Sequence, residues 1–68
     1  NKNMSSYTKA KELKIIYKGL VKAGAHKVGL QYLLYSLQQK ELYQGKGNIN
    51  LINEYYKYDV LERQYKKR

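Results

Sequence analysis

The sequence contains no cysteine, and it has a single histidine, His26. Without cysteine the chain can form neither a disulfide bond nor a thiolate metal site, and one histidine alone does not hold a metal ion. We therefore expect no metal and no cofactor. Because a chain of 68 residues buries only a small core and lacks these cross-links, we expect oligomerisation to contribute to its stability.

Proline, tryptophan and phenylalanine are also absent, and glycine occurs at only five positions, so few residues interrupt helices. The nine aromatic residues are all tyrosines, whose hydroxyl groups need water or a hydrogen-bond partner. The longest apolar run, residues 32–35, is far shorter than the roughly 20 residues of a membrane span. Since the chain begins at Asn1, we expect a fragment of a longer protein, with any targeting or membrane segment outside it.

Acidic residues are scarce: the chain has five, compared with fourteen lysines and arginines, and the formal net charge is +9. Such an excess favours polyanionic partners, nucleic acid first and anionic membrane second. Twelve of the cations are lysines. Lysine suits the phosphate backbone, whereas reading of bases relies on the arginine fork, so the composition predicts binding with little sequence preference.

The spacing of apolar residues predicts one all-α domain over residues 1–68, with a three-helix protomer. The first helix should begin at Ser6 or Thr8 as its N-cap and end near Ala23, before Gly24. Gly19, in the middle of this helix, would allow close approach by a neighbouring helix. The second helix, over residues 26–43, should supply the core through four leucines at helical spacing, Leu30, Leu33, Leu34 and Leu37.

The third helix is expected over residues 49–66, with Asn48 or Asn50 as its N-cap. Its apolar side chains form two stripes, and only one of them can pack on the other two helices. The second stripe then needs another chain or a ligand, which indicates a homodimer. We assign the dimer interface to Leu51, Tyr55, Tyr58 and Leu61, and leave Ile49, Ile52, Tyr56 and Val60 in the other stripe.

The first helix is expected to have an apolar side and a basic side. Leucine, isoleucine and tyrosine occupy one side at positions 13, 16, 17 and 20, and four lysines gather opposite them. Lysines at this spacing repel one another, and a polyanion would reverse that repulsion. The main predicted phosphate contacts are therefore Lys11, Lys14, Lys18 and Lys22.

A second set of candidate phosphate contacts lies outside this helix. Lys46 sits between Gly45 and Gly47 in a segment that lacks the full phosphate-loop pattern and is first of all a flexible turn. The C-terminal cations are favoured by the helix dipole, and they also exceed what a helix end requires. The second set is Lys27, Lys46, Arg63, Lys66 and Lys67.

Catalytic machinery is nearly absent, so we do not expect an enzyme. A general base needs a shifted pKa and a fixed position, and the candidates are His26 and five carboxylates, most of them beside lysine or arginine. Asp59, Glu62 and Arg63 are better explained as charge pairs on a helix surface. His26 is better explained as a histidine that packs beside a turn.

Three functions remain open at this stage. The first is a DNA-binding module of low sequence specificity, acting on single- or double-stranded DNA as a homodimer or higher oligomer. The second is a structural or assembly module whose basic faces bind acidic protein partners. The third is attachment to anionic membrane through the first helix.

Three helices, a basic third helix and a break at Ala23-Gly24-Ala25 resemble a homeodomain or another helix-turn-helix unit. The third helix departs from the homeodomain pattern of Trp-Phe-x-Asn, because it reads Asn53-Glu54-Tyr55-Tyr56-Lys57-Tyr58. Over nearly the whole chain, the size, the Lys/Tyr/Asn bias and the three-helix pattern resemble the C-terminal domain of the membrane-anchored replication-organiser proteins of small Bacillus phages.

This resemblance implies a homeodomain-like protomer in an intertwined six-helix homodimer. Such a dimer would bind DNA with little sequence preference and organise phage DNA replication. It also implies a location on the cytoplasmic side of the host cell, with membrane contact only through segments outside this chain.

Overall fold

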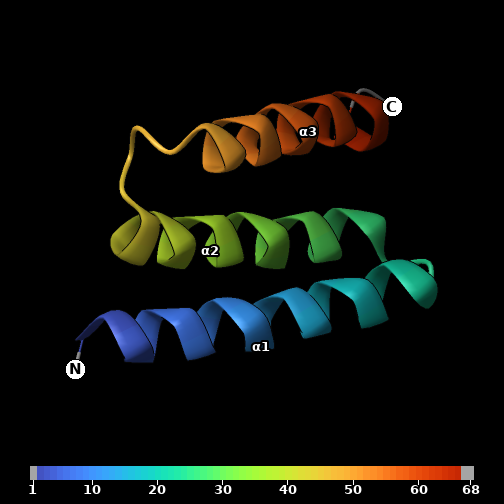
Figure 1. Ribbon diagram of the computed structural model, residues 1–68. Coiled ribbons are helices and arrows are strands. Elements are labelled where there is room, and N and C mark those ends of the chain that lie inside the picture. Colours follow the sequence, from blue (N-terminus) through green and yellow to red (C-terminus); the bar gives the residue numbers. More distant parts are fainter. Residues whose placement is uncertain (1, 67–68) are drawn as a thin grey trace.

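The computed structural model describes residues 2–66 as three α-helices, and it describes side chains from Ser5 to Lys66. α1 spans Lys2–Lys22, α2 spans His26–Gln44 and α3 spans Ile49–Lys66 (Figure 1). The prediction of an all-α, three-helix chain is confirmed over these residues. α1 begins earlier than expected, and Ser6 is a buried residue inside it rather than its N-cap.

The three helices lie side by side in one layer, with α2 in the middle and its neighbours antiparallel to it (Figure 1). The principal-axis extents are 40 × 22 × 12 Å, so the arrangement is thinnest across the layer. The helices of a helix-turn-helix unit meet at about 90–120°. The antiparallel layer therefore does not confirm a homeodomain-like arrangement.

Two short turns with glycine in the left-handed region connect the helices. Gly24 has a φ of +90°, and the amide of Ala25 donates to the carbonyl of Leu20 over 2.8 Å, which ends α1 where expected. Gly45 has the same φ and follows α2. The side-chain oxygen of Asn48 accepts hydrogen bonds from the amides of Asn50 (2.9 Å) and Leu51 (3.3 Å), so Asn48 is the N-cap of α3.

Small residues allow α1 and α2 to approach closely. A Cβ atom at Gly29 would lie 3.2 Å from Cγ2 of Val21, whereas Gly19 has nothing within 4 Å, so the close approach is at Gly29 and not at Gly19. Further along the same contact, the Ser36 hydroxyl is buried and donates to the Ala10 carbonyl over 2.9 Å. At Gly29 and Ser36, side chains or backbone of α1 and α2 are therefore in direct contact.

Leucines of α2 form the core together with one stripe of α3. Leu37 is 0% exposed and Leu30 is 2% exposed, and Leu51 and Tyr58 of α3 are buried against them, with Tyr55 and Leu61 packed at the margin. These four α3 residues are the ones expected at the dimer interface. The structure thus reverses the expected assignment of the two stripes, because Ile49, Ile52, Tyr56 and Val60 are the exposed ones.

A hydrogen bond between helices favours burial of this stripe. Tyr55 donates to Glu41 of α2 over 3.1 Å, and within α3 Tyr58 donates to Glu62 over 3.2 Å. The inner tyrosines therefore bury their rings while their hydroxyl groups keep polar partners. Periodicity alone does not distinguish the two stripes, since it carries no information on which hydroxyl will find a carboxylate.

None of the described helices is long and apolar enough to cross a lipid bilayer.

Replacement of Leu37 by alanine tests whether the thin core carries the stability of the layer. Leu37 is 0% exposed, so Leu37→Ala should lower the free energy of unfolding by about 2–5 kcal/mol. Ile15→Ala is the control, because Ile15 is 68% exposed and its loss should change that free energy by less than about 0.5 kcal/mol. Denaturant unfolding followed by circular dichroism measures both, and equal losses would contradict the assigned core.

Candidate nucleic-acid interface

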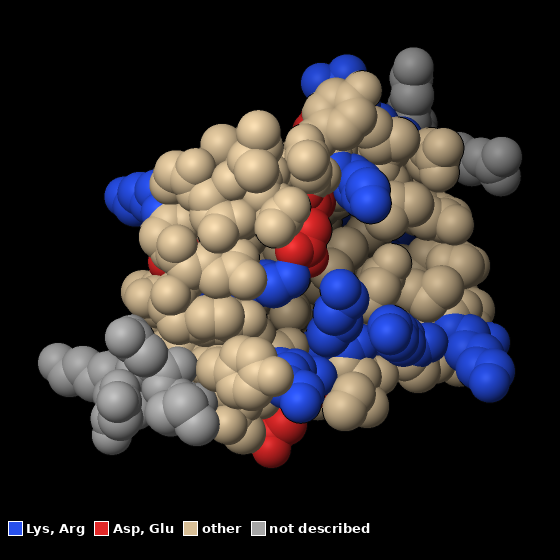
Figure 2. All heavy atoms as spheres, viewed as in Figure 1, with Lys and Arg blue, Asp and Glu red and all other residues tan. Residues whose placement is uncertain are grey.

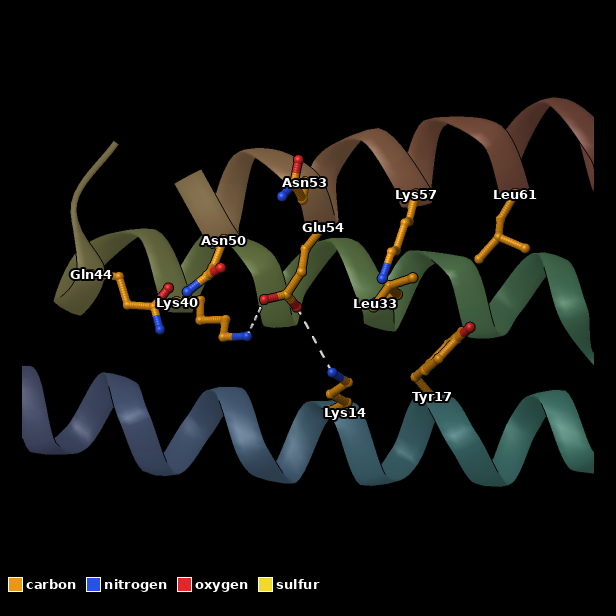
Figure 3. A pocket seen from close by; sticks show the side chains of 10 residues that line it. All are labelled: Lys14, Tyr17, Leu33, Lys40, Gln44, Asn50, Asn53, Glu54, Lys57 and Leu61. Carbon is orange, nitrogen blue, oxygen red and sulfur yellow. Dashed lines mark hydrogen bonds and ion pairs between the residues drawn. The ribbon is translucent and has the colours of Figure 1, made fainter. Parts of the chain in front are cut away.

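A groove of about 580 Å³ runs along one face of the layer, over α2 and between α1 and α3 (Figure 3). It exists because α1 and α3 both pack on α2 and not on each other, so only side chains span the space between them. Its lining mixes cations, amides and apolar groups: Lys14, Tyr17, Leu33, Lys40, Gln44, Asn50, Asn53, Glu54, Lys57 and Leu61.

Each helix contributes one lysine to this groove: Lys14 from α1, Lys40 from α2 and Lys57 from α3. The carboxylate of Glu54 lies among them and forms an ion pair with Lys40 (Figure 3). Its other oxygen lies 3.8 Å from Nζ of Lys14. The lining of the groove thus holds three lysines and one carboxylate, and it keeps an excess of positive charge.

The helical period explains why these residues share a face. Asn50, Asn53, Glu54 and Lys57 recur at intervals of three and four along α3, and Lys40 follows Leu33 by two full turns of α2. The Asn53 and Asn50 amides add hydrogen-bond donors and acceptors beside the cations (Figure 3). The groove can therefore bind an anion with charged and neutral donors together.

The four α1 lysines predicted as phosphate contacts lie on the groove side of their helix. At about 100° per residue, the other three fall within about 80° of Lys14, which lines the groove. Lys18 and Lys22 are exposed, and Nζ of Lys11 lies 5.1 Å above the ring of Tyr7. Figure 2 shows lysine and arginine side chains gathered over α1 and the groove, with carboxylates among them.

The second predicted set is not brought to the groove. Arg63 pairs with Asp59 over 3.2 Å and Lys66 pairs with Glu62 over 3.1 Å, so both cations are compensated by acids one turn away in α3. The hydrogen bond from Lys66 is the main cause that lowers the pKa of Glu62. Lys27 and Lys46 are exposed elsewhere, and Lys67 lies outside the described residues.

The sequence pattern does not single out Lys40, Lys57 or the central carboxylate, Glu54. Lys40 lies in a helix segment with only one lysine and one acid, and Lys57 stands alone between two tyrosines. Neither belongs to a run or a stripe of cations. Only the packing of α1 and α3 on opposite sides of α2 brings them to Lys14.

His26 packs at a turn, as expected. It is the first residue of α2, and its ring stacks on the ring of Tyr65 with a centroid distance of 4.4 Å and an angle of 3° between the planes. Within the described part of the chain, no three potential ligands among histidine and acidic residues come together around a metal position.

Comparison of the chain with models of known families, with curated proteins and with solved structures gives no match. The site is therefore interpreted from its geometry. The groove offers cations and amides but places no nucleophile beside a general base. This arrangement fits binding of an anionic partner.

The hydroxyl of Tyr55 should ionise unusually late. Burial raises the pKa of Tyr55 to about 12, and the hydrogen bond to Glu41 acts in the same direction; burial also raises the pKa of Tyr58. Because Tyr55 ionises near pH 10 once unfolded, its contribution to stability is complete below pH 10 and is lost as the pH rises towards 12.

An alkaline titration of tyrosinate absorbance, with stability measured at each pH, checks this. The wild type should show a late ionisation step and a fall in the free energy of unfolding between about pH 10 and 12. Tyr55→Phe should remove part of both, while Tyr56→Phe, which removes a ring that is 70% exposed, should leave the late step in place. A titration unchanged by Tyr55→Phe would contradict the Glu41 contact.

Proposed function

We propose that this chain is a DNA-binding module of low sequence specificity that contacts phosphates through the groove and the adjacent α1 lysines. The observation that carries the proposal is the convergence of Lys14, Lys40 and Lys57 from three helices on one face. Such a cluster costs electrostatic repulsion that bound phosphates would reverse. The overall charge of +9 would attract the polyanion from a distance.

The dimensions of the α1 stripe suit a nucleic-acid backbone. At about 1.5 Å per residue, Lys11 and Lys22 are separated by about 16 Å along the helix axis. One strand of duplex DNA carries a phosphate about every 3.4 Å along its axis, so the stripe matches about five nucleotides. Because these contacts go to phosphates and come from lysines, they would position the DNA without reading its sequence.

The position of Glu54 also supports a second class of partner, an acidic protein segment. It shows that a carboxylate fits between Lys14 and Lys40, so an acidic protein segment could occupy the same place. The two partners differ in charge density and in the number of counterions released. A steep loss of affinity with salt, shared by DNA duplexes of unrelated sequence, favours DNA over an acidic protein.

The biological setting of this proposal comes from the resemblance to phage replication organisers. On this resemblance we propose a role in phage DNA replication, as a homodimer on the cytoplasmic side of the host cell. The resemblance is in size, composition and helix count. The DNA-binding proposal rests on the groove and is independent of this setting.

Removal of two groove lysines tests the proposal. Lys14→Gln with Lys57→Gln should weaken binding to random-sequence duplexes equally for all sequences, and should make the slope of log affinity against log salt shallower by about 2. Lys9→Gln with Lys27→Gln is the matched control, since these lysines are exposed outside the groove and the net charge changes by the same amount. Equal effects of the two pairs would contradict a binding site in the groove.

In the same titration, Glu54→Gln should change the DNA affinity in the opposite direction. Glu54 occupies the position that a phosphate would take beside Lys14 and Lys40, so its neutralisation should strengthen DNA binding. Glu12→Gln is the matched control, because Glu12 is exposed, does not line the groove and changes the net charge equally. If Glu12→Gln strengthens binding as much, net charge alone explains the effect.

A further inference from the structure

The face of the layer opposite the groove carries an exposed apolar stripe. Val28, Tyr35 and Leu42 of α2 are 53%, 42% and 65% exposed, and they follow one another at intervals of seven residues. At about 100° per residue they lie about 140–180° around α2 from Leu33, which lines the groove. The core residues and the groove residues of α2 thus lie on one side of the helix, and its exposed apolar stripe lies on the other side.

The two outer helices extend this stripe. Relative to Leu51, which faces α2, Ile52 and Tyr56 lie about 100–140° in one direction, whereas Asn50 and Lys57 of the groove lie about 100–120° in the other. Ile52 and Tyr56 are 53% and 70% exposed. Ile16 of α1, which is 44% exposed, lies on the corresponding side of its helix, away from the stripe of four lysines and on the same side as Lys9. We call these six side chains the back face: Ile16, Val28, Tyr35, Leu42, Ile52 and Tyr56.

The exposed area is large for so small a chain. The accessible surface is 5135 Å², compared with roughly 4,500 Å² for a folded monomer of 8.1 kDa. The face of the layer measures 40 × 22 Å, which is comparable with the roughly 800 Å² that each partner buries in a standard protein interface. One contact of ordinary size would therefore cover the back face.

We infer that a second copy of this chain covers the back face, so that two layers pack back to back with their grooves on the outside. Arg63 and Lys66 at the edge of this face are compensated within α3 by Asp59 and Glu62, and Lys9 of α1 is an exposed cation on the Ile16 side, so two copies meet with little repulsion. The groove faces, with their excess of lysine, would repel each other. An anionic membrane would need an excess of free cations around the apolar side chains, whereas Arg63 and Lys66 beside this face are paired with acids and the α1 stripe of four lysines lies on the groove side.

The stripe on α2 is compatible with two-fold symmetry. A two-fold axis near Tyr35 would place Val28 of each copy opposite Leu42 of the other, because both residues are seven positions from Tyr35. A seven-residue repeat also favours packing of two helices at a shallow angle of about 20°. The middle helices would thus form the centre of a two-layer, six-helix dimer.

This dimer has a consequence that rests on the proposed DNA binding. The two grooves of a back-to-back dimer point in opposite directions, so they cannot contact the same short duplex side by side. Each dimer would instead bind two separate DNA segments and hold them together. Bridging of DNA is therefore a property of the dimer and not of the single chain.

The test uses a double variant that combines Val28→Gln and Leu42→Gln and keeps the net charge. The control is Ile15→Gln, which alters an isoleucine that is 68% exposed and lies outside the back face. Sedimentation without DNA, at up to about 100 µM, should give twice the chain mass for the wild type and the control. The double variant should associate at least about 100-fold more weakly while keeping its helical circular dichroism.

The same proteins are then mixed with a biotinylated duplex and a fluorescent duplex, and the fluorescence captured on streptavidin is measured. The wild type and the control should capture the fluorescent duplex, and the double variant should bind single duplexes but lose the capture. A wild type that sediments with the mass of one chain, or a double variant that remains dimeric, overturns the back-to-back dimer. Wild-type protein that stays single in solution and binds anionic vesicles through Val28 and Leu42 overturns it in favour of membrane.

The two proposals fail in different ways in this experiment. A dimer that binds no DNA contradicts the proposed function and leaves the dimer standing. A dimer that binds duplexes without capturing a second one contradicts the bridging geometry and leaves DNA binding standing.

Discussion

Packing of α1 and α3 on the two sides of a single middle helix is the constraint on which the rest of the structure depends. α2 must supply buried leucines for α3 and small residues for α1, and Leu37, Gly29 and Ser36 meet these two needs. Because the outer helices do not pack on each other, the layer has two open faces. A groove on one side and an exposed apolar surface on the other both follow from this one arrangement.

Charge is distributed very unevenly between the two faces. Lys14, Lys40 and Lys57 meet on the groove face, and Glu54 holds two of them by ion pairs. Arg63 and Lys66 are instead neutralised within their own helix. A face with several uncompensated cations suits a polyanion, and a face with few of them suits contact with a like copy. The proposed DNA binding and the proposed dimer thus use different surfaces of the same layer.

The helices and their ends were largely predictable from local sequence, because capping and left-handed turns depend on a few adjacent residues. Asn48 and Gly24 act as expected, although the start of α1 was placed too late. The assignment of the α3 stripes was not predictable, since both are equally apolar and the choice depends on distant partners such as Glu41 for Tyr55. The groove was predictable only through Lys14. Lys40 and Lys57 reach it through contacts between residues far apart in the sequence.

The most direct test of the two-faced layer is a backbone-amide NMR titration of the protein with a short random-sequence duplex. Resonances of groove residues such as Lys14, Asn53 and Lys57 should shift as DNA is added, while those of Val28, Tyr35 and Leu42 should not. Shifts centred on these three back-face residues, with the groove unchanged, would contradict DNA binding in the groove.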